Sequence, residues 1–167
     1  MSTHQSNDRP VDPAVTIAQR RSCAPQWRAF LEALAVSLPG TVGDAAALRV
    51  LAQTGAALAT SHPLPVCGSL DELAKAMNGV FETFDWGTVE VCEAATALEI
   101  GLNGYPCFGG AKGKAIFAAT VEGLLDAWMA KQAERPGLAV RLVDHDGGEY
   151  PRLIFRYERL GPPVPRL

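Results

Sequence analysis

The stretch from residue 81 to residue 93 is where the spacing of apolar residues changes, and it limits the folds open to this chain. Before it, apolar residues recur every three or four positions, whereas after it they alternate. The first spacing indicates helices packed on one side, and the second indicates half-buried strands. Gly87 at the join tolerates a bend and a close backbone approach, and Trp86 is expected to pack where helix and sheet meet. The sequence therefore predicts an α+β domain hinged at residues 85–87.

Three helices are predicted before this junction, at residues 26–38, 44–59 and 70–84. Pro39-Gly40 is expected to end the first, Asp44 to be the N-cap of the second, and Ser69 with Glu72 to form a capping box at the third. One face of the second helix contains both small residues and leucines, and the small residues would let another helix approach closely. The residues of this face are Ala47, Leu48, Leu51, Gly55, Ala56, Leu58 and Ala59.

Strands and one long helix are predicted after the junction. The strands are expected at about 87–93, 96–102, 138–143 and 152–158, and the helix at about 114–134. Asp146-Gly147-Gly148 supplies residues suited to the turn between the last two strands. The fold class is thus α+β, with N-terminal helices followed by a four-stranded antiparallel sheet that one long helix interrupts, the helices packing on one sheet face.

A length of 167 residues favours one domain. We assign it to residues 26–160, between a polar, proline-containing arm at 1–25 and a proline-rich tail at 161–167. Arg20 and Arg21 in the arm either contact a partner or belong to a solvated tail.

The net charge of −3 argues against nucleic acid as a partner, because no basic surplus exists to neutralise phosphates. No run of 18 apolar residues occurs, and the first 25 residues lack the apolar core of a secretory signal, so a cytoplasmic location is expected.

Four cysteines could form two disulfides in an exported protein, but without a signal they are predicted to be reduced and mostly buried; they are Cys23, Cys67, Cys92 and Cys107.

Few residues have the spacing that catalysis or metal binding requires. His4, His62 and His145 lie far apart, which argues against a zinc site, although a single haem ligand is harder to exclude. Glu90 and Glu93 fall on opposite faces of their strand, so they would not converge as paired carboxylates. The glycine-rich loop at 108–114 opens a helix as a phosphate site would, but it departs from the Walker pattern at Phe108 and Ala115.

Several strings, in their order and spacing, resemble the D subunit of bacterial cellulose synthase across about residues 26–158. These are Trp27 to Leu38, Pro63-Leu64-Pro65-Val66-Cys67, Asn78 to Phe84 leading into Trp86-Gly87-Thr88-Val89, and Val121-Glu122-Gly123-Leu124-Leu125 with Trp128.

The resemblance implies a non-catalytic accessory subunit with no cofactor, no metal and no catalytic residue. Members of that family form dimers that assemble into a cylindrical octamer, which guides β-1,4-glucan chains for export and crystallisation beside the membrane-embedded synthase and other secretion subunits. Carried over to this sequence, the segment near the glucan passageways corresponds to Arg20, Arg21, Ser22, Gln26 and Trp27.

Two other functions stay open from the residues themselves. One is a small-molecule sensor that holds haem or a lipid between helices and sheet. The other is an enzyme that uses the loop at 109–114 on a phosphorylated substrate. The apolar stripes on every predicted helix exceed what one sheet face can cover, which favours contacts between subunits.

Overall fold

The computed structural model describes residues 23–133, 137–143 and 152–159. Its elements follow the predicted order of three helices, two strands, a long helix and two strands. They are α2 (Pro25–Val42), α3 (Asp44–Ser61), α4 (Leu70–Phe84), β1 (Thr88–Ala94), β2 (Ala97–Asn103), α5 (Gly110–Ala133), β3 (Leu138–Val143) and β4 (Arg152–Arg159).

The four strands form one antiparallel sheet in the order β1-β2-β4-β3, which confirms the α+β class predicted from the sequence. Val91, Ile100 and Phe155 lie opposite one another in the register, and alternate residues on either side of them share their face of the sheet. Ile100 and Phe155 are fully buried, so this face forms the core. The predicted turn at Asp146-Gly147-Gly148 lies outside the described residues.

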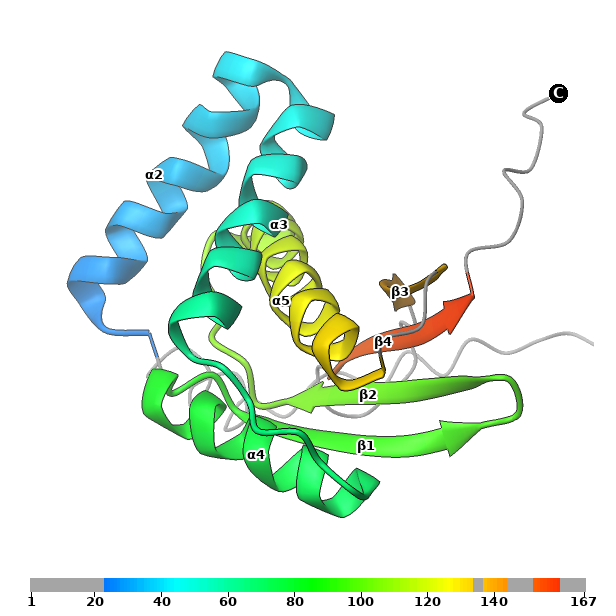
Figure 1. Ribbon diagram of the computed structural model, residues 1–167. Helices are drawn as coiled ribbons and strands as arrows, with labels where there is room; N and C mark the ends of the chain where they lie inside the picture. The colour runs from blue at the N-terminus through cyan, green and yellow to red at the C-terminus, as the bar shows by residue number, and fades with distance from the viewer. Residues whose placement is uncertain (1–22, 134–136, 144–151, 160–167) are drawn as a thin grey trace, which may run out of the picture.

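The helices form two layers over the sheet (Figure 1). α5 crosses the core face and carries ten buried residues, including the fully buried Trp128. α4 runs along the β1 edge, whereas α2 and α3 lie beyond α5 as an outer pair. None of these helices has the length and apolarity needed to cross a bilayer.

The contact between α3 and α5 depends on two glycines. A Cβ atom at Gly55 would overlap the carbonyl oxygen of Thr120, and one at Gly123 would overlap the carbonyl oxygen of Ala52. The two helix backbones therefore approach as closely as glycine allows. The small-residue face predicted for the second helix has this role in the structure, although Leu48 on it remains 40% exposed.

The junction at residues 85–87 joins helix to sheet through aromatic rings. The Trp86 ring lies 5.0 Å from Phe84 and 5.2 Å from Phe117, measured between ring centroids. Gly87 has a φ of +90°, and a Cβ there would overlap the carbonyl oxygen of Asn103 at the end of β2. Both predictions for this junction, a packed tryptophan and a glycine required by close approach, are confirmed.

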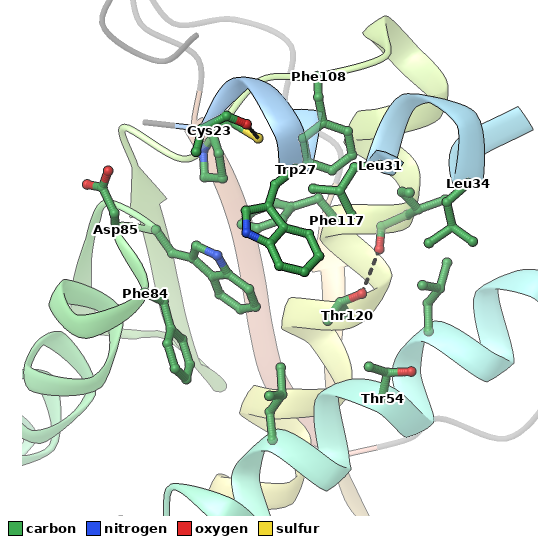
Figure 2. Close-up of a pocket in the computed structure, with 16 residues that line it drawn as sticks. Cys23, Trp27, Leu31, Leu34, Thr54, Phe84, Asp85, Phe108, Phe117 and Thr120 are labelled. Carbon is green, nitrogen blue, oxygen red and sulfur yellow. Dashed lines mark hydrogen bonds between the residues drawn. The ribbon is translucent and has the colours of Figure 1, made fainter. Parts of the chain in front are cut away.

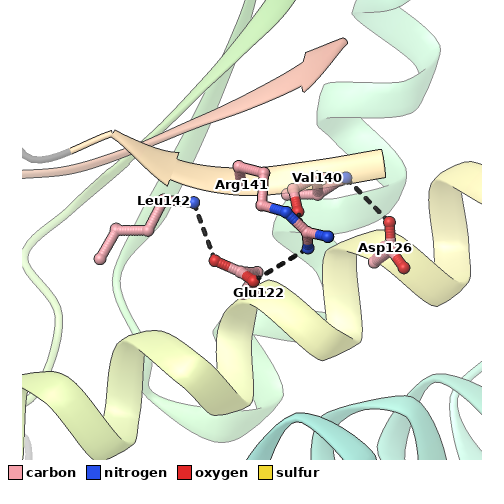
Figure 3. Close-up of polar contacts among 5 residues, drawn as sticks. All are labelled: Glu122, Asp126, Val140, Arg141 and Leu142. Carbon is pink, nitrogen blue, oxygen red and sulfur yellow. Dashed lines mark hydrogen bonds and ion pairs between the residues drawn. The ribbon is translucent and has the colours of Figure 1, made fainter. Parts of the chain in front are cut away.

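Helix side chains form hydrogen bonds with backbone groups of both edge strands. At the β1 edge, the Asn78 amide donates to the Val89 carbonyl at 2.8 Å and accepts from the Val89 N–H at 2.7 Å. At the β3 edge, Asp126 accepts from the Val140 N–H and Glu122 from the Leu142 N–H, both at 2.8 Å (Figure 3). Edge groups paired in this way are not free to bind a further strand.

Two predicted helix boundaries are wrong. Pro39-Gly40 does not end the first helix, because Pro39 has a φ compatible with a helix and its carbonyl accepts the Gly43 N–H at 2.8 Å. The chain breaks instead at Gly43, whose φ is +84°. Gly43 is therefore the N-cap of α3, and Asp44 lies in the first turn without a side-chain capping bond.

Three further predictions need correction. The capping box at α4 is half formed: Ser69 accepts from the Glu72 N–H, but the Glu72 carboxylate accepts from Gly68 rather than from Ser69. α5 begins at Gly110, four residues earlier than expected, since tertiary packing outweighs the low helix propensity of glycine. All four cysteines are free, as predicted, but only Cys23 is buried and Cys92 is exposed.

Replacing Gly55 by alanine should lower the free energy of unfolding by about 1–3 kcal/mol, because the added methyl forces α3 away from α5. Gly79 on α4 is the matched control, since nothing lies within 4 Å of its Cβ position. Gly79→Ala should raise the free energy of unfolding by about 0.5–1 kcal/mol through a lower chain entropy of the unfolded state. Urea denaturation of both variants measures the difference; equal effects would contradict the close approach.

Replacing Asp126 by alanine should cost about 1–3 kcal/mol, because the N–H of the fully buried Val140 loses its acceptor. Asp126→Asn keeps an acceptor oxygen at the same position and should recover most of this loss. Thermal denaturation followed by circular dichroism compares the two. If both variants melt together well below the parent protein, the charge of Asp126 matters rather than its hydrogen bond.

Candidate functional site

The outer helix α2 exposes an unusual amount of apolar surface. Of its 18 residues only Ala35 is buried, whereas the Trp27 side chain is 60% exposed and Val36 is 59% exposed. Phe30 and Val42 on the same helix, with Leu48 and Val50 in α3, are also exposed. We call these six residues the α2 surface. Single exposed apolar residues are common, but six on two adjacent helices favour a site of interaction.

More than one side of α2 is apolar. Trp27 and Phe30 lie one turn apart with their rings edge to face at 6.1 Å. Val36, nine positions after Trp27, points to the opposite side of the helix, because nine residues turn it by about two and a half revolutions. An exposed helix that is apolar around most of its circumference is expected to be covered by another molecule.

A pocket of about 540 Å³ lies behind α2 (Figure 2). Trp27, Leu31 and Leu34 of α2 form one wall, and Phe117 and Thr120 of α5 lie opposite. Ile116 of α5 also lines it. Its remaining walls come from α3, from the end of α4 with Trp86, and from the loop before α5; these residues include Leu51, Thr54, Leu58, Phe84, Asp85, Pro106 and Phe108. The wall is overwhelmingly hydrocarbon, as in pockets that bind apolar molecules.

Cys23 lies at the end of this pocket where α2 begins. Burial raises the pKa of its thiol, and the neighbouring Arg28 guanidinium opposes that rise. Arg28 Nη2 donates to the Cys23 carbonyl at 2.9 Å, while its buried Nε atom has no hydrogen-bond partner. A raised pKa keeps the thiol protonated at neutral pH, so Cys23 is poorly suited to be a nucleophile.

The structure brings together two of the five residues assigned to the glucan path. Gln26 and Trp27 lie in the first turn of α2, both exposed, and Trp27 also lines the pocket. Arg20, Arg21 and Ser22 lie outside the described residues. A pocket between helices and sheet was one alternative left open by the sequence, but its lining residues were not predicted; the signal for them was the excess of apolar residues on the first helix.

The glycine-rich loop does not present an open anion site. The Gly109 N–H, just before α5, points to the Glu32 carboxylate of α2 at 3.5 Å. A carboxylate therefore already lies where a phosphate would approach the start of this helix.

The other candidate groups have structural partners. Glu90 and Glu99, on the outer sheet face, pair with Arg152 at 3.2 Å and with Arg156 at 3.8 Å. The His62 ring lies 3.3 Å from the Leu58 carbonyl and packs on Phe84. Within the described ranges, no group of three His, Cys, Asp or Glu side chains could hold a metal ion.

Comparison with known protein families identifies a match over most of the chain. The sequence pattern of the family of cellulose synthase D subunits matches residues 14–157. A search of curated proteins found no significant match. Among solved structures, a vinyl-4-reductase family protein from Methanocaldococcus jannaschii is similar at a TM-score of 0.49 and 15% identity, over 95% of this chain and 100% of that chain. A similarity at this level supports no statement about function.

Proposed function

Because the chain belongs to the family of cellulose synthase D subunits, we propose that it is a non-catalytic accessory subunit of the bacterial cellulose synthase complex. In this proposal, copies of the chain associate first as dimers and then as an octameric cylinder. The cylinder guides β-1,4-glucan chains for export and crystallisation, beside the membrane-embedded synthase and other cellulose secretion subunits.

The observation that carries this proposal is the α2 surface. An 18-residue helix with one buried residue gains little from its own chain, and four exposed apolar side chains on it remain in water in a single copy. Burying them against a second copy would remove that cost. Because Asn78, Glu122 and Asp126 already bond to backbone groups at the two sheet edges, helices rather than strands are the expected contact between copies.

The glucan path is proposed to pass Arg20, Arg21, Ser22, Gln26 and Trp27. Gln26 and Trp27 support it through their exposure at the start of α2. Tryptophan faces stack on sugar rings, and amide and guanidinium groups bond hydroxyls, which suits weak contacts with a chain that must slide.

The proposal places the assembly on the cytoplasmic side of the synthase. The four cysteines are free, and Cys92 is exposed. Free, exposed thiols are typical of proteins in a reducing compartment.

Phe30→Ser combined with Val36→Glu should convert the assembly to smaller species, because both changes place polar groups on the α2 surface. Sedimentation velocity at micromolar concentration measures the change, and circular dichroism should show an intact fold since both residues are exposed. Val66→Glu is the matched control: Val66 is 84% exposed but lies in the segment between α3 and α4. A parent protein that sediments as a monomer would contradict the proposal.

Replacing Arg20, Arg21 and Gln26 together by alanine should lower the yield or crystalline order of cellulose in a producing strain. Glucosyl transfer in isolated membranes should be unchanged, because the proposed role follows polymerisation. X-ray diffraction of the cellulose and radiolabelled glucose incorporation give the two readouts, with Val66→Ala as the control. Loss of glucosyl transfer in the variant would point to a catalytic rather than an accessory role.

A further inference from the structure

The pocket behind α2 has a wall chemistry that a glucan chain does not match. Five aromatic side chains line it, namely Trp27, Phe84, Trp86, Phe108 and Phe117, together with five leucine or isoleucine side chains. The volume of about 540 Å³ lies within the range of about 300–1,000 Å³ found for small-molecule sites. Figure 2 shows side chains from α2, α3, α4 and α5 around one space.

The hydroxyl groups in this wall are already satisfied. Thr54 Oγ1 donates to the Val50 carbonyl at 3.0 Å. Thr120 Oγ1 donates to the Ile116 carbonyl at 2.9 Å (Figure 2). Both threonines therefore bond to their own helices rather than into the pocket. A sugar ring in this space would lose its hydrogen bonds to water and find few replacements, which is strongly unfavourable.

Polar groups gather at the end of the pocket where α2 begins. Cys23 lies there, and Arg28 bonds to its carbonyl oxygen. Asp85 is the only charged side chain among the described residues that line the pocket. This distribution, a hydrocarbon interior with polar groups near one end, matches an amphiphile with a long apolar part and a small head group.

We infer that the pocket between α2 and α5 binds the single hydrocarbon chain of a lipid-like molecule. The chain lies between the aromatic rings, and its head group lies near Cys23 and Asp85. This site is separate from the proposed contacts between copies, because Phe30 and Val36 of the α2 surface are not among its lining residues. Trp27 alone belongs to both, so a molecule in the pocket packs directly against the helix that carries the α2 surface.

Calorimetric titration of the purified full chain with octanol, decanol and dodecanol tests the inference. Binding should saturate at one molecule per chain, and each added methylene should tighten it by roughly fourfold until the pocket is full. Dodecanoate, with the same chain length as dodecanol, distinguishes an anionic fatty acid from a neutral lipid as the source. Either preference supports the site.

Thr54→Trp should weaken dodecanol binding at least tenfold, because the larger side chain occupies the pocket from an exposed position that folding does not depend on. Val66→Trp places the same ring outside the pocket, in the exposed segment between α3 and α4, and should leave the affinity within twofold. If Thr54→Trp does not fold, Leu34→Trp fills the pocket from the opposite wall and gives the same comparison.

Three outcomes would overturn the inference: no saturable binding of any alcohol, binding that Thr54→Trp and Leu34→Trp leave unchanged, or displacement of dodecanol by cellotetraose. Dissociation of the assembly by stoichiometric dodecanol would also overturn it, since a second copy would then be the occupant. The titration has no cellulose readout, so its failure is distinct from failure of the accessory role.

Discussion

The close contact between α3 and α5 determines where every outer part of this protein lies. Gly55 and Gly123 let the two backbones meet without side chains between them, each at a point where a Cβ atom would overlap a carbonyl oxygen of the other helix. α5 is fixed on the sheet by its buried residues, so α3 is fixed through α5. α2 is joined directly to α3 through Gly43, and its contacts with other helices and strands are made with α3 and α5.

The aromatic junction after α4 has two roles because its rings face two directions. Phe81 and Phe117 are buried, and each lies within about 6 Å of Trp86, measured between ring centroids. Phe117 and Trp86 also line the pocket behind α2. The residues that join helix to sheet are therefore the same residues that form part of the pocket wall.

The sheet and the outer helices differ in how their exposed groups are covered. At both sheet edges, polar side chains from α4 and α5 pair with backbone groups, which limits pairing with other strands. Within the described part of the chain, four apolar side chains of α2 (Trp27, Phe30, Val36 and Val42) remain exposed to solvent. The sheet edges therefore have polar partners within the chain, whereas these apolar side chains of α2 face solvent.

Local patterns in the sequence were enough to predict the elements and their class. Alternation predicted all four strands to within about a residue, and the small residues of the second helix predicted a close helix contact. Boundaries at Pro39 and Gly110 could not be predicted, because tertiary packing and one glycine at position 43 outweighed local propensity. The strand order β1-β2-β4-β3 and the pocket required the structure. The strand order and the pocket each bring together residues that are far apart in the sequence; in the pocket, Cys23 and Thr120 are about a hundred positions apart. The spacing of neighbouring residues does not indicate which distant segments meet.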